Sequence, residues 1–330
     1  MTPLHTVRQA LRIAGATALE GLQQPVALLL ALSASVLALL GPLLALYTFG
    51  EEGRLARDSG LALHLVLGLF VVAFTAGSAL HDELRGGTAA AVLAKPVGRG
   101  SFVVGKWLGV VGVLAVFSAT ATLSTLLAER TAEHFIETRD ALGSLVDTYS
   151  GLGSLAAVAV ALAVAAVLNY ARRFRFTLAA QFLLPAALLA TLLACGFVTR
   201  AGTRPEGGFA LQVNLRALPA AALVAALLSL YAAIATALST RLRAAPTAAI
   251  LGAFLFLGFF AGTLAGRPGP LPALVVALVP DVQAFWCTDA LAGGGAIPPG
   301  HMARAALLAL SSSAFWLLLG RLSLERRDLG

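Results

Sequence analysis

Residues 217–240 read ALPAAALVAALLSLYAAIATALST, a run of 24 residues without a charged side chain. A helix of this length, rising about 1.5 Å per residue, crosses the roughly 30 Å hydrocarbon core of a bilayer. The whole chain has the same character, because 59% of its 330 residues are apolar and only 12% are charged. Too little polar surface remains to cover a soluble globule of this size. The composition therefore predicts an all-α polytopic membrane protein.

Eight apolar runs are long enough to span a membrane. They cover residues 25–49, 61–80, 107–128, 151–170, 176–198, 217–240, 245–266 and 303–320. The stretch 271–279 is apolar but short and bounded by prolines, which predicts a re-entrant or interfacial segment. No polar insert is long enough to be a soluble domain. We therefore expect one transmembrane domain over 1–330, with outer loops at 128–150 and 267–302.

The distribution of charge predicts the topology. With eight spans both termini lie on one side, together with the segments 81–106, 171–175 and 241–244. This side carries 14 Lys and Arg residues against five acids. The positive-inside rule places such a side in the cytoplasm. We expect a multi-pass protein of the bacterial cytoplasmic (inner) membrane with both termini cytoplasmic.

An amphipathic helix is predicted before the first span, within residues 1–24. Between residues 4 and 22, apolar side chains recur at helical spacing. They are Leu4, Val7, Leu11, Ala14, Ala18 and Leu22. Such a helix can lie in the cytoplasmic headgroup layer. The alternative is a solvated tail.

Few polar side chains inside the apolar runs could carry chemistry. His64 and Gln181 are the notable ones, and a lone His in an apolar helix is more often a packing residue than a ligand. The five His residues do not approach metal-ligand spacing, and no GxSxG motif offers a nucleophile. No run contains the buried acid or the visible break that an ion-coupled carrier normally shows. We expect no catalytic, cofactor-binding or metal-binding residue in this chain.

Two glycine patterns carry little specific information. Residues 100–106, GSFVVGK, match the start of a P-loop, but Trp107 stands where Ser or Thr must bind magnesium, so nucleotide binding is not expected. GxxxG spacings occur at Gly105/Gly109 and at Gly262/Gly266. They are compatible with close packing in a dimer or within the bundle and specify neither.

The segment between the second and third spans, residues 81–106, reads HDELRGGTAAAVLAKPVGRGSFVVGK. It begins with charges of alternating sign, continues with small residues, and ends with a proline and a basic cluster. Residues 82–94 can form a short surface helix that stops at Pro96. Its length and organisation favour a surface on which another protein docks. The alternative is a basic loop that only obeys the topology rule.

This segment resembles the signature between the second and third spans of the ABC type-2 permeases. The matching positions are Glu83, Arg85, Gly87, Thr88, Leu93, Pro96, Arg99, Gly105 and Lys106. Weaker similarity lies at 237–250, at 279–291 and in the C-terminal ERRDLG. The predicted N-terminal amphipathic helix also agrees with this family.

The resemblance implies an exporter-type permease subunit that works as a homodimer or heterodimer in the lipid bilayer. A separate ATP-binding subunit would dock on a coupling helix at 82–95 and would bind the MgATP, so this chain needs no cofactor and is not itself an enzyme. Nucleic acid is not an expected partner. The residues implied at the coupling interface are Asp82, Glu83, Arg85, Gly87, Thr88 and Arg99.

The family core has six spans, so the pair at 151–170 and 176–198 is expected to be an extra hairpin. Two other functions stay open at this point. The chain could be a secondary carrier that uses Asp281 or Asp289, or a membrane scaffold that transports nothing.

Overall fold

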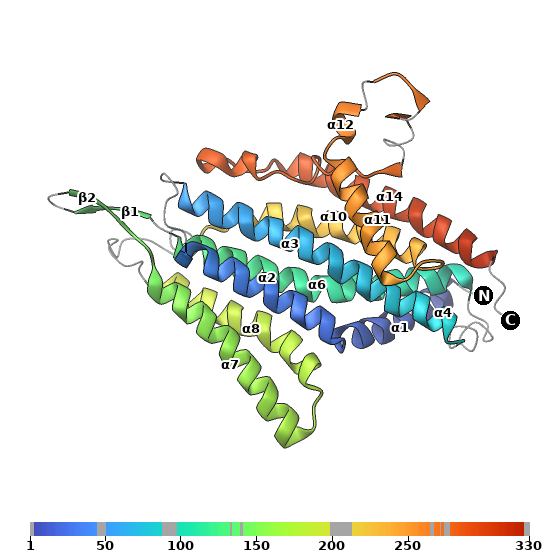
Figure 1. Cartoon of the computed structure of the whole chain (residues 1–330), viewed down its shortest axis with the longest axis horizontal. Helices are drawn as coiled ribbons and strands as arrows, with labels where there is room; N and C mark the ends of the chain where they lie inside the picture. The colour runs from blue at the N-terminus through green and yellow to red at the C-terminus, as the bar shows by residue number, and fades with distance from the viewer. Residues whose placement is uncertain are drawn as a thin grey trace.

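The computed structural model describes residues 3–44, 51–87, 98–132, 134–138, 141–198, 213–264, 267–270, 272–273 and 278–326. In this part of the chain seven helices are long and apolar enough to cross a membrane, and an eighth apolar helix is shorter. The prediction of an all-α polytopic membrane protein is confirmed. In Figure 1, α1 (Pro3–Leu22) begins and α14 (Pro299–Glu325) ends at the same end of the bundle, which we call the terminal end. The opposite end is called the distal end.

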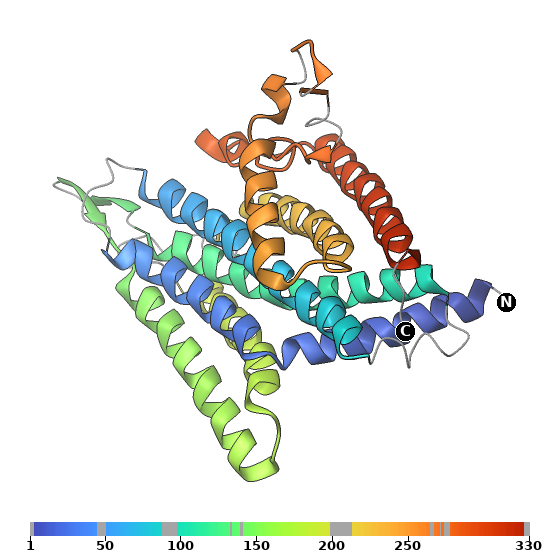
Figure 2. The same ribbon diagram turned by 45° about the vertical axis from the view of Figure 1, so that its right-hand side comes forward.

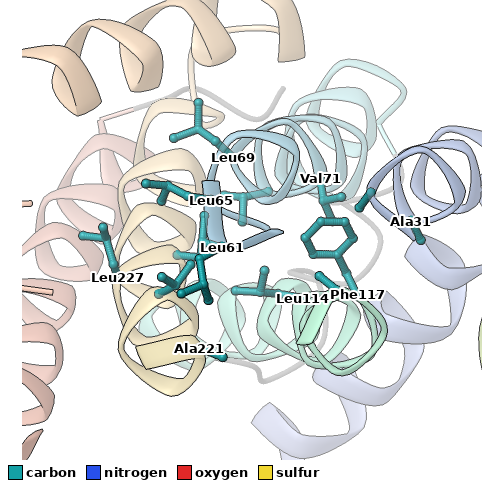
Figure 3. Close-up of a cluster of buried hydrophobic side chains, with 14 of the residues drawn as sticks. Ala31, Leu61, Leu65, Leu69, Val71, Leu114, Phe117, Ala221 and Leu227 are labelled. Atoms are coloured by element: carbon teal, nitrogen blue, oxygen red, sulfur yellow. The ribbon is translucent and has the colours of Figure 1, made fainter. Parts of the chain in front are cut away.

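The core of the bundle surrounds α3 (Glu52–Ala76), which packs against α2 (Pro25–Leu44), α6 (Arg99–Thr131) and α10 (Ala217–Leu238). Figure 3 shows the layer that these helices share. It contains Leu61, Leu65, Leu69 and Val71 from α3, Leu114 and Phe117 from α6, Ala31 from α2, and Ala221 and Leu227 from α10. All of these side chains are buried. One face of α3 is therefore buried against α2, α6 and α10, while Val66, Phe70 and Phe74 on another face remain exposed.

Two helices of the core are longer than a bilayer is thick. α3 continues through a wide turn, η1 (Gly77–Asp82), into α4 (Glu83–Arg85), and the 34 residues from Glu52 to Arg85 form one helical rod about 50 Å long. α6 has 33 residues. The helix predicted to begin at residue 107 begins at Arg99, so residues 99–106 of the predicted cytoplasmic segment form the first turns of α6. Both rods reach the terminal end.

A helical hairpin lies at the edge of the bundle. It consists of α7 (Thr148–Arg172) and α8 (Phe176–Phe197), which pack mainly on each other and, more weakly, on α6 (Figures 1 and 2). The antiparallel strands β1 (His134–Thr138) and β2 (Ala141–Leu145) connect α6 to α7 at the distal end. The hairpin predicted at 151–170 and 176–198 is present; its first helix is longer than predicted, and its second ends one residue earlier.

The predicted span 245–266 is wrong as a single helix. α11 (Ala244–Gly258) has 15 residues, which extend only about 22 Å, and it crosses α3 and α10 steeply in Figures 1 and 2. A turn then separates it from α12 (Ala261–Leu264). The expectation that no membrane helix is broken is therefore also wrong. Of the short apolar stretch 271–279, residues 271 and 274–277 lie outside the described residues.

A returning segment of chain ends α11. The Val282 amide donates to the Gly258 carbonyl (3.2 Å), and the Gln283 side-chain amide donates to the Phe259 carbonyl (2.8 Å). These bonds replace helical bonds that the two carbonyls would otherwise make. Val282 and Phe285 are fully buried in the main core. The chain between α11 and η2 (Asp289–Gly294) thus re-enters the bundle.

Close backbone approach at Gly258 makes this break possible, which gives a first prediction. A Cβ atom at position 258 would lie 2.6 Å from the Pro280 carbonyl oxygen. We expect Gly258→Ala to lower stability by about 1–3 kcal/mol, the usual cost of overpacking. Gly252→Ala on the same helix is the control, because nothing lies within 4 Å of its Cβ position. Equal melting temperatures of the two variants in detergent would contradict the contact.

Candidate functional site

The residues predicted at the coupling interface lie at the terminal end. Asp82, Arg85 and Gly87 are exposed at the end of the α3 rod, and Arg99 is exposed at the start of α6. Thr88 lies outside the described residues. The structure thus brings residues from the beginning and from the later part of the segment 81–106 to the same end of the bundle.

The prediction of a separate surface helix that starts at residue 82 is wrong. Residues 82–85 belong to the rod that begins at Glu52, and this rod ends in a turn at Gly86 and Gly87. The remainder of the predicted helix, from residue 88 onward, lies outside the described residues. The described part of the predicted coupling helix is therefore a direct extension of a membrane helix.

Glu83 faces into the bundle rather than outward. Its carboxylate accepts from the ammonium group of Lys106 on α6 at 2.5 Å. The Lys106 side chain is only 5% exposed, against 22% for Glu83, and its ammonium group lies 5.6 Å from the centre of the Phe102 ring. A charge this deeply buried is tolerated because it is paired. The ion pair joins the end of the α3 rod to α6.

The start of α6 is also tied to the end of α14. The Arg99 guanidinium donates to the Glu325 carbonyl oxygen (3.2 Å), and Arg321 donates to the Glu325 carboxylate (2.8 Å). Arg241, which follows α10, donates to the Ser323 carbonyl oxygen (3.3 Å). These cations meet the carboxyl end of α14, where the helix dipole favours positive charge. The terminal ends of α6, α10 and α14 are thereby held together.

α1 packs along the first half of α6 through small residues. Cβ atoms added at Gly105 and Gly109 would lie 2.9 Å from the carbonyl oxygens of Ala10 and Ala14, respectively. The GxxxG spacing in α6 thus serves packing within this chain. The predicted apolar stripe of α1 is divided, because Ala14 and Leu22 are buried while Val7 and Leu11 are exposed. The exposed part is the face that remains for a membrane surface.

The wide turn η1 contacts several helices at the terminal end. The Gln24 side-chain amide, at the junction of α1 and α2, donates to the Ser78 hydroxyl in η1 (2.5 Å). η1 also touches α1, α6, α10 and α11. Widened helical turns of this kind are uncommon and occur frequently at functional sites. The apolar sequence gave no sign of this turn.

Buried charges at the distal end were missed by the sequence analysis. Arg130 lies 3.6 Å from Asp147, and Arg57 lies 3.6 Å from Glu129. Glu129, Arg130 and Asp147 fall in the predicted outer loop 128–150, and Arg57 precedes the predicted span 61–80. The helices in fact extend past these charges, and pairing across the bundle allows the burial.

The polar residues singled out inside the predicted spans are packed within the bundle. The Nε2 atom of His64 lies 2.9 Å from the Ser118 hydroxyl, as expected of a packing residue, and Gln181 is buried in α8. Asp289 is exposed and pairs with Arg54 (3.2 Å). Among the described residues, no group of three or more His, Cys, Asp or Glu side chains could hold a metal ion.

Comparison with known proteins identifies the family. Residues 24–187, about half of the chain, match the family described as ABC-2 family transporter protein. The chain belongs to the ABC-2 transporter family. The match runs from α2 into α8 and contains both the α3 rod and the Glu83–Lys106 pair. No curated protein matches the chain significantly.

The resemblance to ABC type-2 permeases is confirmed by this match. The protein is a multi-pass permease component of an ABC transporter, and the family supports the role of a transport subunit. Membership also implies an ATP-binding partner subunit and usually a dimeric arrangement.

Proposed function

We propose that this permease, with a second permease copy and a separate ATP-binding subunit, forms an exporter driven by ATP. The MgATP binds to the partner subunit, which docks on the segment 81–106. The exposed side chains Asp82, Arg85 and Arg99 form the described part of the docking surface, together with Gly87, and Thr88 is proposed to extend it. The excess of cations on this side supports a cytoplasmic terminal end in a bacterial inner membrane.

One observation supports the proposal: the exposed residues proposed for docking lie at the end of a membrane helix. The helical rod from Glu52 to Arg85 leads from the distal end to the exposed Arg85. A displacement imposed at its end moves the rod as a rigid element, because the packed core around it resists deformation. The Glu83–Lys106 pair passes the same displacement to α6. Closure of the ATP-binding subunits would thus shift both core helices together.

The test uses the tagged permease purified in mild detergent from its native host, together with the ATP-binding subunit that co-purifies with it. We expect Arg85→Glu to reduce both the amount of bound subunit and the coupled ATPase rate by about tenfold, since charges across an interface strongly affect association. Membrane insertion stays normal, because Arg85 is exposed. Arg172→Glu, an exposed cation on the hairpin, is the matched control. Full binding and ATPase activity in Arg85→Glu would count against the docking surface.

The break between α11 and α12 favours one other function. Secondary carriers place substrate sites at broken helices, and Asp281 lies close to this break. Transport by proteoliposomes separates the two functions. An exporter of the proposed kind requires ATP and the partner subunit, whereas a carrier needs only an ion gradient.

A further inference from the structure

A cavity of about 460 Å³ lies between α10, α12 and α14. Its walls are largely apolar and include Leu230 from α10 and Phe315 and Trp316 from α14. The polar groups at its surface are Asp281, Ser311 and Ser312. A mostly apolar cavity of this size with a few convergent polar groups is typical of a site for a small organic molecule.

The cavity lies beside the break between α11 and α12. Ala261 and Gly262, at the start of α12, line it on one side, and Pro280 and Asp281 of the returning segment line it on another. The same segment caps the end of α11 through Val282. In transporters, broken helices expose backbone polar groups within the membrane, where an unbroken helix offers only its side chains to a ligand. The break therefore positions a carboxylate beside an apolar cavity.

Asp281 gives the cavity its charge. It is the only ionisable side chain among the described lining residues, so none of them is basic. One carboxylate oxygen accepts from the backbone amide of Gln283 (3.0 Å), and the other lies 4.0 Å from the Cβ position of Gly262, toward α12. A carboxylate beside apolar walls is costly unless a cation compensates it. The cavity thus favours a positively charged occupant.

The aromatic side chains support the same conclusion. The ring centres of Phe315 and Trp316 lie 6.0 Å apart with an interplanar angle of 79°, and the ring centre of Phe254 lies 6.0 Å from that of Trp316. Aromatic faces attract cations, and tryptophan does so most strongly. Apolar walls, aromatic rings and one carboxylate together match a molecule with a positive charge and an apolar body.

We propose that this cavity binds amphipathic organic cations. Describing them as the transported substrate rests on the proposed function, whereas binding itself does not. An anion of the same shape is excluded by Asp281, and a strongly hydrated neutral polymer gains nothing from the apolar walls. The cavity thereby indicates the chemical class of the ligand that this permease binds.

Binding of tetraphenylphosphonium to the full-length permease in nanodiscs of neutral lipid tests this proposal. Tetraphenylborate, with the same shape and the opposite charge, is the matched ligand, and empty nanodiscs give the lipid background. We expect saturable binding of the cation only. Asp281→Asn should weaken it about five- to tenfold, as expected for a partly exposed charge pair. Asparagine keeps an oxygen that can accept from the Gln283 amide, so the turn is preserved.

Two further variants complete the test. Asp289→Asn changes an exposed acid outside the cavity lining and should leave the affinity unchanged. Trp316→Ala should weaken cation binding severalfold, and Trp316→Phe should retain most of it. Equal affinity of Asp281→Asn and the original protein, or equal binding of the two ligands, would overturn the proposal. Because the assay contains no ATP-binding subunit, its outcome is independent of whether that subunit docks.

Discussion

A Glu83→Ala variant should melt at a clearly lower temperature than a Lys106→Met variant of the same permease. Glu83→Ala leaves the Lys106 ammonium buried without its carboxylate, because that side chain is only 5% exposed. Removing one partner of a buried pair costs about 3–5 kcal/mol. Lys106→Met removes the buried charge and keeps an apolar chain of similar length, while Glu83, with 22% exposure, can still reach water.

The double variant Glu83→Gln/Lys106→Met separates the pair from other effects. It leaves no unpaired charge, so we expect it to recover most of the stability lost in Glu83→Ala. Thermal aggregation followed by size-exclusion chromatography in one detergent measures all variants alike. A Glu83→Ala variant as stable as the original protein would show that the pair does not hold the α3 rod to α6.

The second large effect is expected at the contact between α1 and α6. A Cβ atom at Gly109 would lie 2.5 Å from the Thr17 Cβ atom and 2.9 Å from the Ala14 carbonyl oxygen. Gly109→Leu therefore cannot be accommodated without moving α1. We expect α1 to separate from α6 and stability to fall by about 3 kcal/mol or more, since overpacking costs about 1–3 kcal/mol and more where the neighbour cannot move away.

A disulfide reports this separation directly. The Cβ positions of Ala18 and Gly112 are 3.2 Å apart, close to the roughly 3.5–4.5 Å of natural disulfides. Cysteines at these two positions, with Cys195 and Cys287 replaced by serine, should cross-link in the original background and fail to do so with Gly109→Leu. Gly15→Leu is the control, because nothing lies within 4 Å of that position. Persistent cross-linking in Gly109→Leu would contradict the packing.

The coupling segment shows how far the sequence could lead. Its alternating charges and its family resemblance located the terminal end, and the family match contains this segment. The pattern could not show which charges face outward. Glu83 and Arg85 look equivalent in the sequence, yet Glu83 pairs with the buried Lys106 while Arg85 is exposed. Their orientation depends on the position of α6, which is distant in the chain.

The helix boundaries were limited by a different cause. Hydropathy ends a predicted span at the first charge, so α3 and α6 were predicted too short and Arg57 and Arg130 were placed in loops. These helices continue because Glu129 and Asp147 lie within reach of the two guanidinium groups. Pairing between distant segments is not visible in a local window of residues.

The sequence by itself determined that this chain is a helical membrane protein, because 59% apolar residues in long uncharged runs can satisfy their backbone only as helices in lipid. Tertiary structure alone decided where α11 breaks. Residues 245–266 contain no charged side chain and were predicted to form one span. In the structure, the Val282 backbone amide and the Gln283 side chain donate to the carbonyls of Gly258 and Phe259. A hydrogen bond from a segment more than twenty residues away thus ended a helix that local hydropathy would have continued.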